Sequence, residues 1–114
     1  MSILATDLGA PGADPGPIFR LETEAACVRC SGELDLATAP QLERAVRGLA
    51  ARGATAIEVD LARIEFMDCA GLGTLVALAE QAERAPWTIS ITAMSLPVAR
   101  LIALTGSSRP FAAL

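Results

Sequence analysis

Hydrophobic residues recur along this chain with two different periods, which alternate from one segment to the next. Between residues 56 and 61, and again from Trp87 to Met94, every second residue is apolar, as expected for strands with one buried face. Three other segments carry apolar residues three and four positions apart, which predicts amphipathic helices. Their apolar stripes are Leu42, Ala45, Val46 and Leu49; Leu72, Leu75, Val76, Ala79 and Ala82; and Val98, Leu101 and Ile102.

Capping and breaking residues set the expected ends of these helices. Thr38 is placed to cap the first helix, Pro40 fits its first turn, and Gly53 is expected to end it. The second helix should begin near Cys69 or Ala70. The third should open at Ser95 to Pro97 and stop at Gly106.

Two further strands are expected before the first helix. Residues 18–22 and 25–34 read as a hairpin with a polar turn at Thr23 and Glu24. Gly32 interrupts the second of these strands and is expected to mark a bulge or bend.

The predicted order is therefore β-β-α-β-α-β-α, which indicates an α/β fold. Strands that are separated by helices favour parallel pairing, so the sheet should be mixed and four-stranded. Because the later strands are half polar, the helices should lie mainly on one face. We expect one domain over residues 18–114, preceded by a flexible tail over residues 1–17 that is rich in Gly and Pro.

Composition narrows the functional classes. The 114 residues are 53% hydrophobic and carry a net charge of -4. All nine basic residues are arginines that are scattered along the sequence, so no basic cluster of the kind that binds nucleic acid is present. There is no His, so the usual nucleophile systems and most zinc sites are excluded, and we expect a non-enzyme without metal or cofactor. No run approaches a membrane span and no secretory signal is visible, so we expect a cytoplasmic protein without direct membrane insertion.

The cysteines do not suggest a redox or metal site. Cys27 and Cys30 form a C-x-x-C motif, but they fall in a predicted strand, where residues three apart point to opposite faces. We expect both to be ordinary reduced thiols.

The run from Ile64 to Leu75 carries the most information about function. An apolar strand end stops at Asp68, passes through Cys69 and Ala70, and continues as Gly-Leu-Gly into the second helix. Such a junction leaves backbone amides free at a helix start, where Asp68 can cap them and complement the helix dipole. Gly71 and Gly73 are expected to permit close approach of helix and strand.

These residues resemble the STAS domain, and most closely the bacterial anti-sigma factor antagonists. The motifs that carry the resemblance are Gly32-Glu33-Leu34-Asp35, Thr38-Ala39-Pro40-Gln41-Leu42, Val59-Asp60-Leu61 and Phe66-Met67-Asp68-Cys69-Ala70-Gly71-Leu72-Gly73. The resemblance implies binding to an anti-sigma factor, often a serine kinase of the GHKL type, which frees a sigma factor. It also implies a partner surface that includes Asp35, Asp68, Cys69, Ala70, Gly71 and Thr74.

The sequence departs from the family pattern at the position that the kinase would phosphorylate. Cys69 and Ala70 occupy both hydroxyl positions, with Ala70 at the acceptor, so neither can receive phosphate from a Ser/Thr kinase. We therefore expect an antagonist that is not switched by phosphorylation. The C-terminal helix of the family is expected to be shortened or absent, because only a few residues follow Gly106.

Three alternatives stay open at the level of sequence. The chain could instead resemble the STAS subunit that braces the ATPase of a phospholipid-transporting ABC complex. Cys69 could serve as a redox switch or as an enzyme nucleophile, although no general base of the usual type is present. Nucleotide binding at Gly71 and Gly73 is disfavoured, because the chain has no Lys for a phosphate-binding loop.

Overall fold

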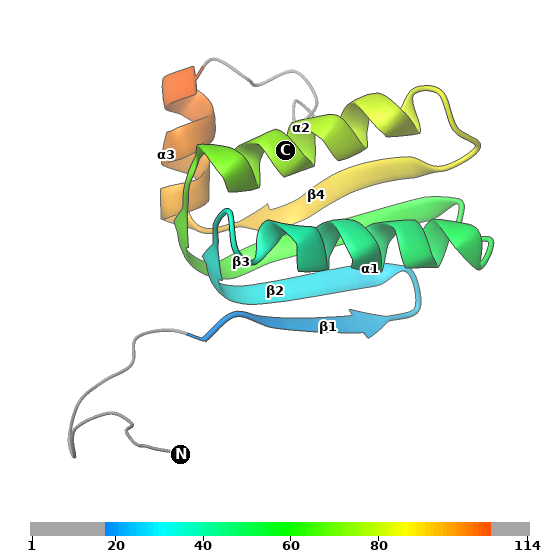
Figure 1. Cartoon of the computed structure of the whole chain (residues 1–114), viewed down its shortest axis with the longest axis horizontal. Coiled ribbons are helices and arrows are strands. Elements are labelled where there is room, and N and C mark those ends of the chain that lie inside the picture. Colours follow the sequence, from blue (N-terminus) through cyan, green and yellow to red (C-terminus); the bar gives the residue numbers. More distant parts are fainter. Residues whose placement is uncertain (1–17, 106–114) are drawn as a thin grey trace.

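The computed structural model describes residues 18–105, which form a four-stranded sheet and three helices in the predicted order (Figure 1). The strands are β1 (Arg20–Glu24), β2 (Cys27–Leu34), β3 (Ala56–Met67) and β4 (Thr88–Met94). The helices are α1 (Ala39–Ala51), α2 (Cys69–Ala82) and α3 (Leu96–Thr105). The expected tail, the stop at Gly106 and the segment after it lie outside the described residues.

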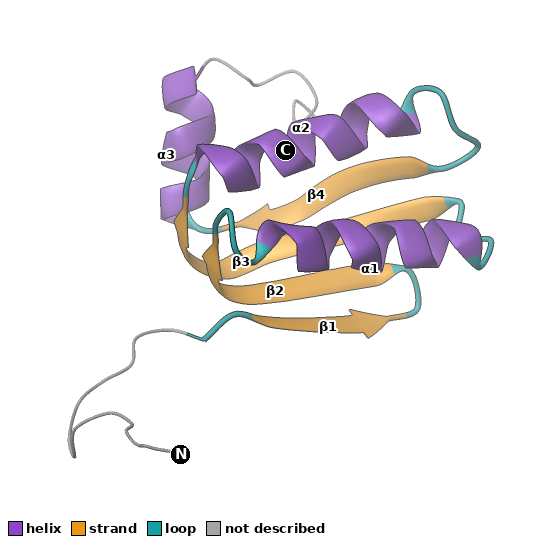
Figure 2. Ribbon diagram, viewed as in Figure 1, coloured by secondary structure: helices purple, strands orange, loops and turns teal. Residues whose placement is uncertain are grey.

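The strands lie in the sheet in the order β1-β2-β3-β4, which is their order in the sequence. β1 is antiparallel to β2, whereas β2, β3 and β4 are parallel and are connected through α1 and α2. The predicted mixed sheet is thereby confirmed. α1 and α2 lie side by side over one face of the sheet, and α3 stands at one end against β3 (Figure 2).

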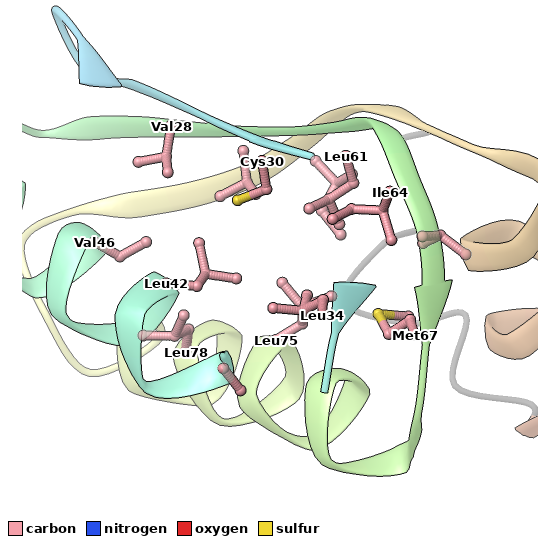
Figure 3. Close-up of a cluster of buried hydrophobic side chains, with 14 of the residues drawn as sticks. Val28, Cys30, Leu34, Leu42, Val46, Leu61, Ile64, Met67, Leu75 and Leu78 are labelled. Carbon is pink, nitrogen blue, oxygen red and sulfur yellow. The ribbon is translucent and has the colours of Figure 1, made fainter. Parts of the chain in front are cut away.

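The core lies between the sheet and the pair formed by α1 and α2 (Figure 3). Side chains of β2 and β3 meet those of α1 and α2 in this layer, and removing them from water is the main source of stability. The largest of the fully buried side chains are Leu34, Leu42, Ile57, Leu61, Ile64, Leu75 and Leu78. Leu78 was not part of the predicted apolar stripe of the second helix, whereas Leu72 and Leu75 were.

β3 is longer than the alternation predicts, because it runs to Met67 and does not end at Leu61. Alternation stops at Leu61 since two register shifts insert extra residues into β3 opposite β2. After the first shift Ile64 returns to the buried face, and after the second Met67 does, so that buried residues recur every third position. A strand with bulges therefore lost the period of two on which the prediction rested.

The predicted hairpin is present, but its turn was placed two residues too early. Thr23 and Glu24 are the last residues of β1, and Glu24 is paired with Cys27, so the turn consists of Ala25 and Ala26. Ala25 adopts a positive φ of 53°, which alanine rarely does, and this is why composition did not reveal the turn.

The bulge expected at Gly32 is confirmed. Gly32 has a φ of +94° and lies at the register shift between β2 and β3. Because Gly32 has no Cβ, the chain that enters β1 at Ile18 and Phe19 can pass close to it.

Candidate functional site

The candidate site forms where β2 and β3 end side by side. Leu34 is paired with Met67, and the next residue on each strand is an aspartate. The Asp68 amide donates to the Leu34 carbonyl at 3.3 Å, so the strand pairing continues to the point where both chains leave the sheet. Asp35 and Asp68, which are far apart in sequence, are thereby held at one edge.

Asp68 caps α2, as predicted. Its backbone is extended (φ -102°, ψ -176°), and its Oδ1 accepts a hydrogen bond from the Gly71 amide at 2.9 Å. The carboxylate satisfies one of the free amides at the helix start and places negative charge at the positive end of the helix dipole.

Asp35 organises the loop that leads into α1. Its Oδ1 accepts from the amides of Ala37 at 3.0 Å and Thr38 at 3.1 Å, and its carbonyl accepts from Ala39 at 2.8 Å. The structural role expected of Asp35 in this loop is therefore confirmed, and the same contacts fix the position of its carboxylate next to the α2 junction.

Thr38 does not act as the side-chain cap that the sequence suggested. It occupies the N-cap position of α1, but its side chain makes no capping bond. The Thr38 hydroxyl instead donates back to the Glu33 carbonyl at 2.7 Å and accepts from the Asp35 amide at 2.9 Å. The Thr38 hydroxyl therefore closes the loop, and the Asp35 carboxylate binds the amides of Ala37 and Thr38, which precede α1.

The two glycines of the junction have different roles. A Cβ on Gly71 would lie 2.4 Å from the Leu34 carbonyl oxygen and 2.9 Å from Met67 Cγ, so only glycine lets α2 approach the strands. A Cβ on Gly73 would meet nothing within 4 Å, so the expectation of a close approach there was wrong.

The remaining predicted site residues surround this junction at the start of α2. Cys69 is exposed, and Ala70 and Thr74 are half-buried, so all three have solvent-accessible surface that a partner can contact. Gly71 is buried, so it contributes to the junction by packing against the strands and not by exposed surface.

Two apolar side chains at this end of the sheet were not among the predicted site residues. Leu36, next to Asp35, is 76% exposed, and Phe66, two residues before Asp68, is 48% exposed. Large apolar side chains held in water at a strand end are typical of contact sites. The signal that could have found them is their position one or two residues from an aspartate.

The cysteines are free thiols in different environments. Burial raises the pKa of the Cys30 thiol to about 12, and the nearby Asp60 and Cys27 groups add to the shift. Burial is also the largest cause of the raised pKa of Cys27. The predicted strand geometry is confirmed, since both lie in β2, with Cys30 buried in the core.

Alkylation at neutral pH should therefore modify Cys69 first, Cys27 more slowly, and Cys30 only when the protein unfolds. Only the thiolate reacts, and a buried thiol with a pKa near 12 almost never forms it at pH 7. Mass spectrometry of peptides after timed exposure to iodoacetamide measures the three rates, with the unfolded protein in urea as the control. Rapid labelling of Cys30 in the folded protein would contradict this order.

The arrangement is suited to binding. In residues 18–105 no group of three or more His, Cys, Asp and Glu side chains is placed to hold a metal ion. None of the helices in this range has the length and apolar content that a membrane span requires. Two fixed carboxylates and an exposed thiol lie at one end of the sheet, and two exposed apolar side chains lie within two residues of the carboxylates in the sequence.

Comparison with known proteins gives a consistent result. Residues 19–112 match the sequence model of a family described as "Mlab, STAS domain". The chain is 32% identical over 79 residues to the anti-sigma-B factor antagonists of Staphylococcus epidermidis and Staphylococcus aureus, and the match covers 69% of this chain and 73% of theirs.

Solved structures are similar as well. A crystal structure of an anti-sigma factor antagonist from Mycobacterium paratuberculosis has a TM-score of 0.67 and 31% identity, and the match covers 91% of this chain and 87% of that one. The unphosphorylated form of the anti-sigma factor antagonist SpoIIAA shares the fold, with a TM-score of 0.57 at 22% identity over 76% of this chain and 83% of that one.

The alternative reading, a subunit of a phospholipid-transporting ABC complex, receives no support from these relatives and structures, which are anti-sigma factor antagonists. The family model, the relatives and the solved structures all point to the same family. The chain belongs to the STAS domain family, and within it to the anti-sigma factor antagonists.

Proposed function

We propose that this protein binds an anti-sigma factor through the end of the sheet where β2 and β3 meet α2, and that this binding frees a sigma factor for transcription. We define the junction surface as Asp35, Leu36, Phe66, Asp68, Cys69, Ala70 and Thr74. The observation that carries the proposal is the fixed pair Asp35 and Asp68 beside the exposed start of α2, in a chain related to antagonists.

The chemistry of the junction surface fits a protein partner. Leu36 and Phe66 provide apolar area that gains free energy when a partner covers it. The carboxylates of Asp35 and Asp68 are held by backbone amides, so little side-chain entropy is lost on binding. A partner with basic side chains around an apolar centre would complement this arrangement. The role is regulatory binding in the cytoplasm, with no catalytic step.

The partner that we favour is an anti-sigma factor of the GHKL serine-kinase type, and this chain would not be regulated by its phosphorylation. A phosphate at the acceptor position adds about two negative charges next to two existing carboxylates, which opposes docking. Ala70 cannot accept phosphate, and Cys69 beside it has no hydroxyl. The protein would then be competent to bind at all times. Phosphate found on Thr74 after incubation with the kinase and ATP would contradict this.

The test is to mimic the missing phosphate. Ala70→Glu places a negative charge on the junction surface and should weaken binding at least about tenfold. Ala51→Glu is the matched control, because Ala51 is exposed at the opposite end of α1 and its substitution changes the net charge equally (Figure 1).

The tagged wild type and both variants are used to capture proteins from a lysate of the source organism, and the captured proteins are identified by mass spectrometry. The expected result is an anti-sigma factor retained by wild type and Ala51→Glu and lost with Ala70→Glu. Equal retention by all three would show that the junction surface is not the contact. Capture without any anti-sigma factor would contradict the proposed partner.

A further inference from the structure

The face of the sheet that α1 and α2 leave uncovered carries its charges in ordered rows. Arg20 of β1 is paired with Ser31 of β2, and Ser31 is paired with Arg63 of β3, so these three side chains cross the sheet in one line. We call this line the arginine row. The next line in the same direction consists of Glu22, Arg29 and Asp60.

A bulge in β3 creates the arginine row. Arg29 is paired with Asp60 but Ser31 with Arg63, so three steps along β3 correspond to two along β2. Without the extra residue, Ala62 would stand opposite Ser31 and Arg63 would face the core. Bulges of this kind commonly redirect a side chain towards a site.

The arginines on this face differ in their partners. Arg29 lies 3.4 Å from Glu24 and 3.9 Å from Asp60, so its charge is already compensated. Within residues 18–105 no carboxylate lies within ion-pair distance of Arg20 or Arg63. The Ser31 hydroxyl likewise forms no hydrogen bond in the described part of the chain.

The arginine row borders a hollow of about 290 Å³, which the carboxylates of Glu22 and Asp60 also line. Because neighbouring strands are ~4.8 Å apart, the backbones of Arg20 and Arg63 lie about 10 Å from each other, with Ser31 between them. The two long side chains can bring their guanidinium groups to one anion across this distance. Asp60 is fixed by the Ala62 amide, which donates to its Oδ1 at 2.9 Å.

We propose that this hollow binds a small phosphate ester, with the phosphate held by Arg20, Ser31 and Arg63. Guanidinium groups form paired, charge-assisted hydrogen bonds to phosphate, and a serine hydroxyl supplies a further donor. Glu22 and Asp60 repel a second anionic group but accept hydrogen bonds from hydroxyl or amino groups. The ligand is therefore a monophosphate with hydroxyl or amino groups a few ångströms from the phosphate, such as a sugar phosphate.

This site does not rest on the proposed partner binding, because none of Arg20, Ser31 and Arg63 belongs to the junction surface. Its test uses the full-length protein labelled with ¹⁵N, titrated in separate experiments with inorganic phosphate, ribose 5-phosphate and ribose. We expect saturable shifts of the Arg20, Ser31 and Arg63 amides with both phosphates, tighter binding of ribose 5-phosphate, and no response to ribose.

The double variant Arg20→Gln/Arg63→Gln should bind ribose 5-phosphate at least about tenfold more weakly. The matched control is Arg44→Gln/Arg100→Gln, which removes two exposed helix arginines and changes the net charge equally, and it should bind like wild type. Ser31→Ala should weaken binding less than the double variant does.

The spectra themselves report whether each variant is folded. Absence of saturable shifts with both phosphates, or equal losses in the two double variants, would overturn the site. Equal affinity for phosphate and ribose 5-phosphate would overturn the role given to Glu22 and Asp60.

Discussion

Replacing Gly71 by alanine is expected to lower the free energy of unfolding by about 3 kcal/mol, although alanine is the better helix former. The added Cβ would lie 2.4 Å from the Leu34 carbonyl oxygen and 2.9 Å from Met67 Cγ. The first of these atoms belongs to the backbone at the end of the central strand β2, and it also accepts a hydrogen bond from the Asp68 amide at 3.3 Å. Neither strand can move away without loosening the pairing that holds Asp35 next to Asp68.

Gly73→Ala is the matched control for this experiment. Gly73 lies in the same helix two residues later, and a Cβ there would meet nothing within 4 Å. This substitution should raise stability by up to about 1 kcal/mol through helix propensity alone. Urea unfolding of wild type and both variants, followed by circular dichroism, measures the two effects. Similar stabilities for the two variants would show that α2 is not seated tightly on Leu34.

Gly32→Ala is expected to cost about 2–3 kcal/mol for two separate reasons. Gly32 has a φ of +94°, which L side chains rarely adopt, and a Cβ would lie 2.5 Å from the Ile18 carbonyl oxygen and 2.9 Å from the Phe19 Cα. The substitution therefore strains the backbone and pushes against the chain that enters β1.

Gly53→Ala separates these two causes. Gly53 has nearly the same φ of +97°, but nothing lies within 4 Å of its Cβ position, so its substitution should cost only about 1 kcal/mol. The difference between the two losses measures the contact with Ile18 and Phe19. Equal losses in thermal and urea unfolding would mean that the close approach of β1 to Gly32 contributes nothing.

The sequence predicted the elements best where one periodicity held for the whole segment. Helix α1 and the first half of β3 follow their apolar patterns closely, and Ile57, Val59 and Leu61 are buried as expected. Prediction failed after Leu61, because the two bulges are fixed by the pairing with β2 and leave no signal in β3 itself. The turn at Ala25 was missed for the same reason, since its positive φ follows from the hairpin and not from residue type.

The proposed site residues could be named from the sequence because most of them are neighbours in it. Asp68, Cys69, Ala70 and Gly71 are consecutive, and the capping role of Asp68 depends only on the helix that follows it. The contribution of Asp35 depends on parallel pairing, which the helix between the two strands predicted and the register of Leu34 with Met67 provides. Leu36 and Phe66 were missed, because exposure of an apolar side chain is a property of the folded chain.

The sequence by itself determined the order of strands and helices, the cap at Asp68 and the lack of imidazole chemistry. All of these follow from residue type and short-range spacing. Tertiary structure decided which residues stand opposite one another across the sheet. That register brings Asp35 beside Asp68, gives Gly71 but not Gly73 a close neighbour, and lines up Arg20, Ser31 and Arg63. The physical reason is that strand pairing and bulges determine the face of the sheet to which each side chain points. One inserted residue moves the side chains that follow it to the opposite face.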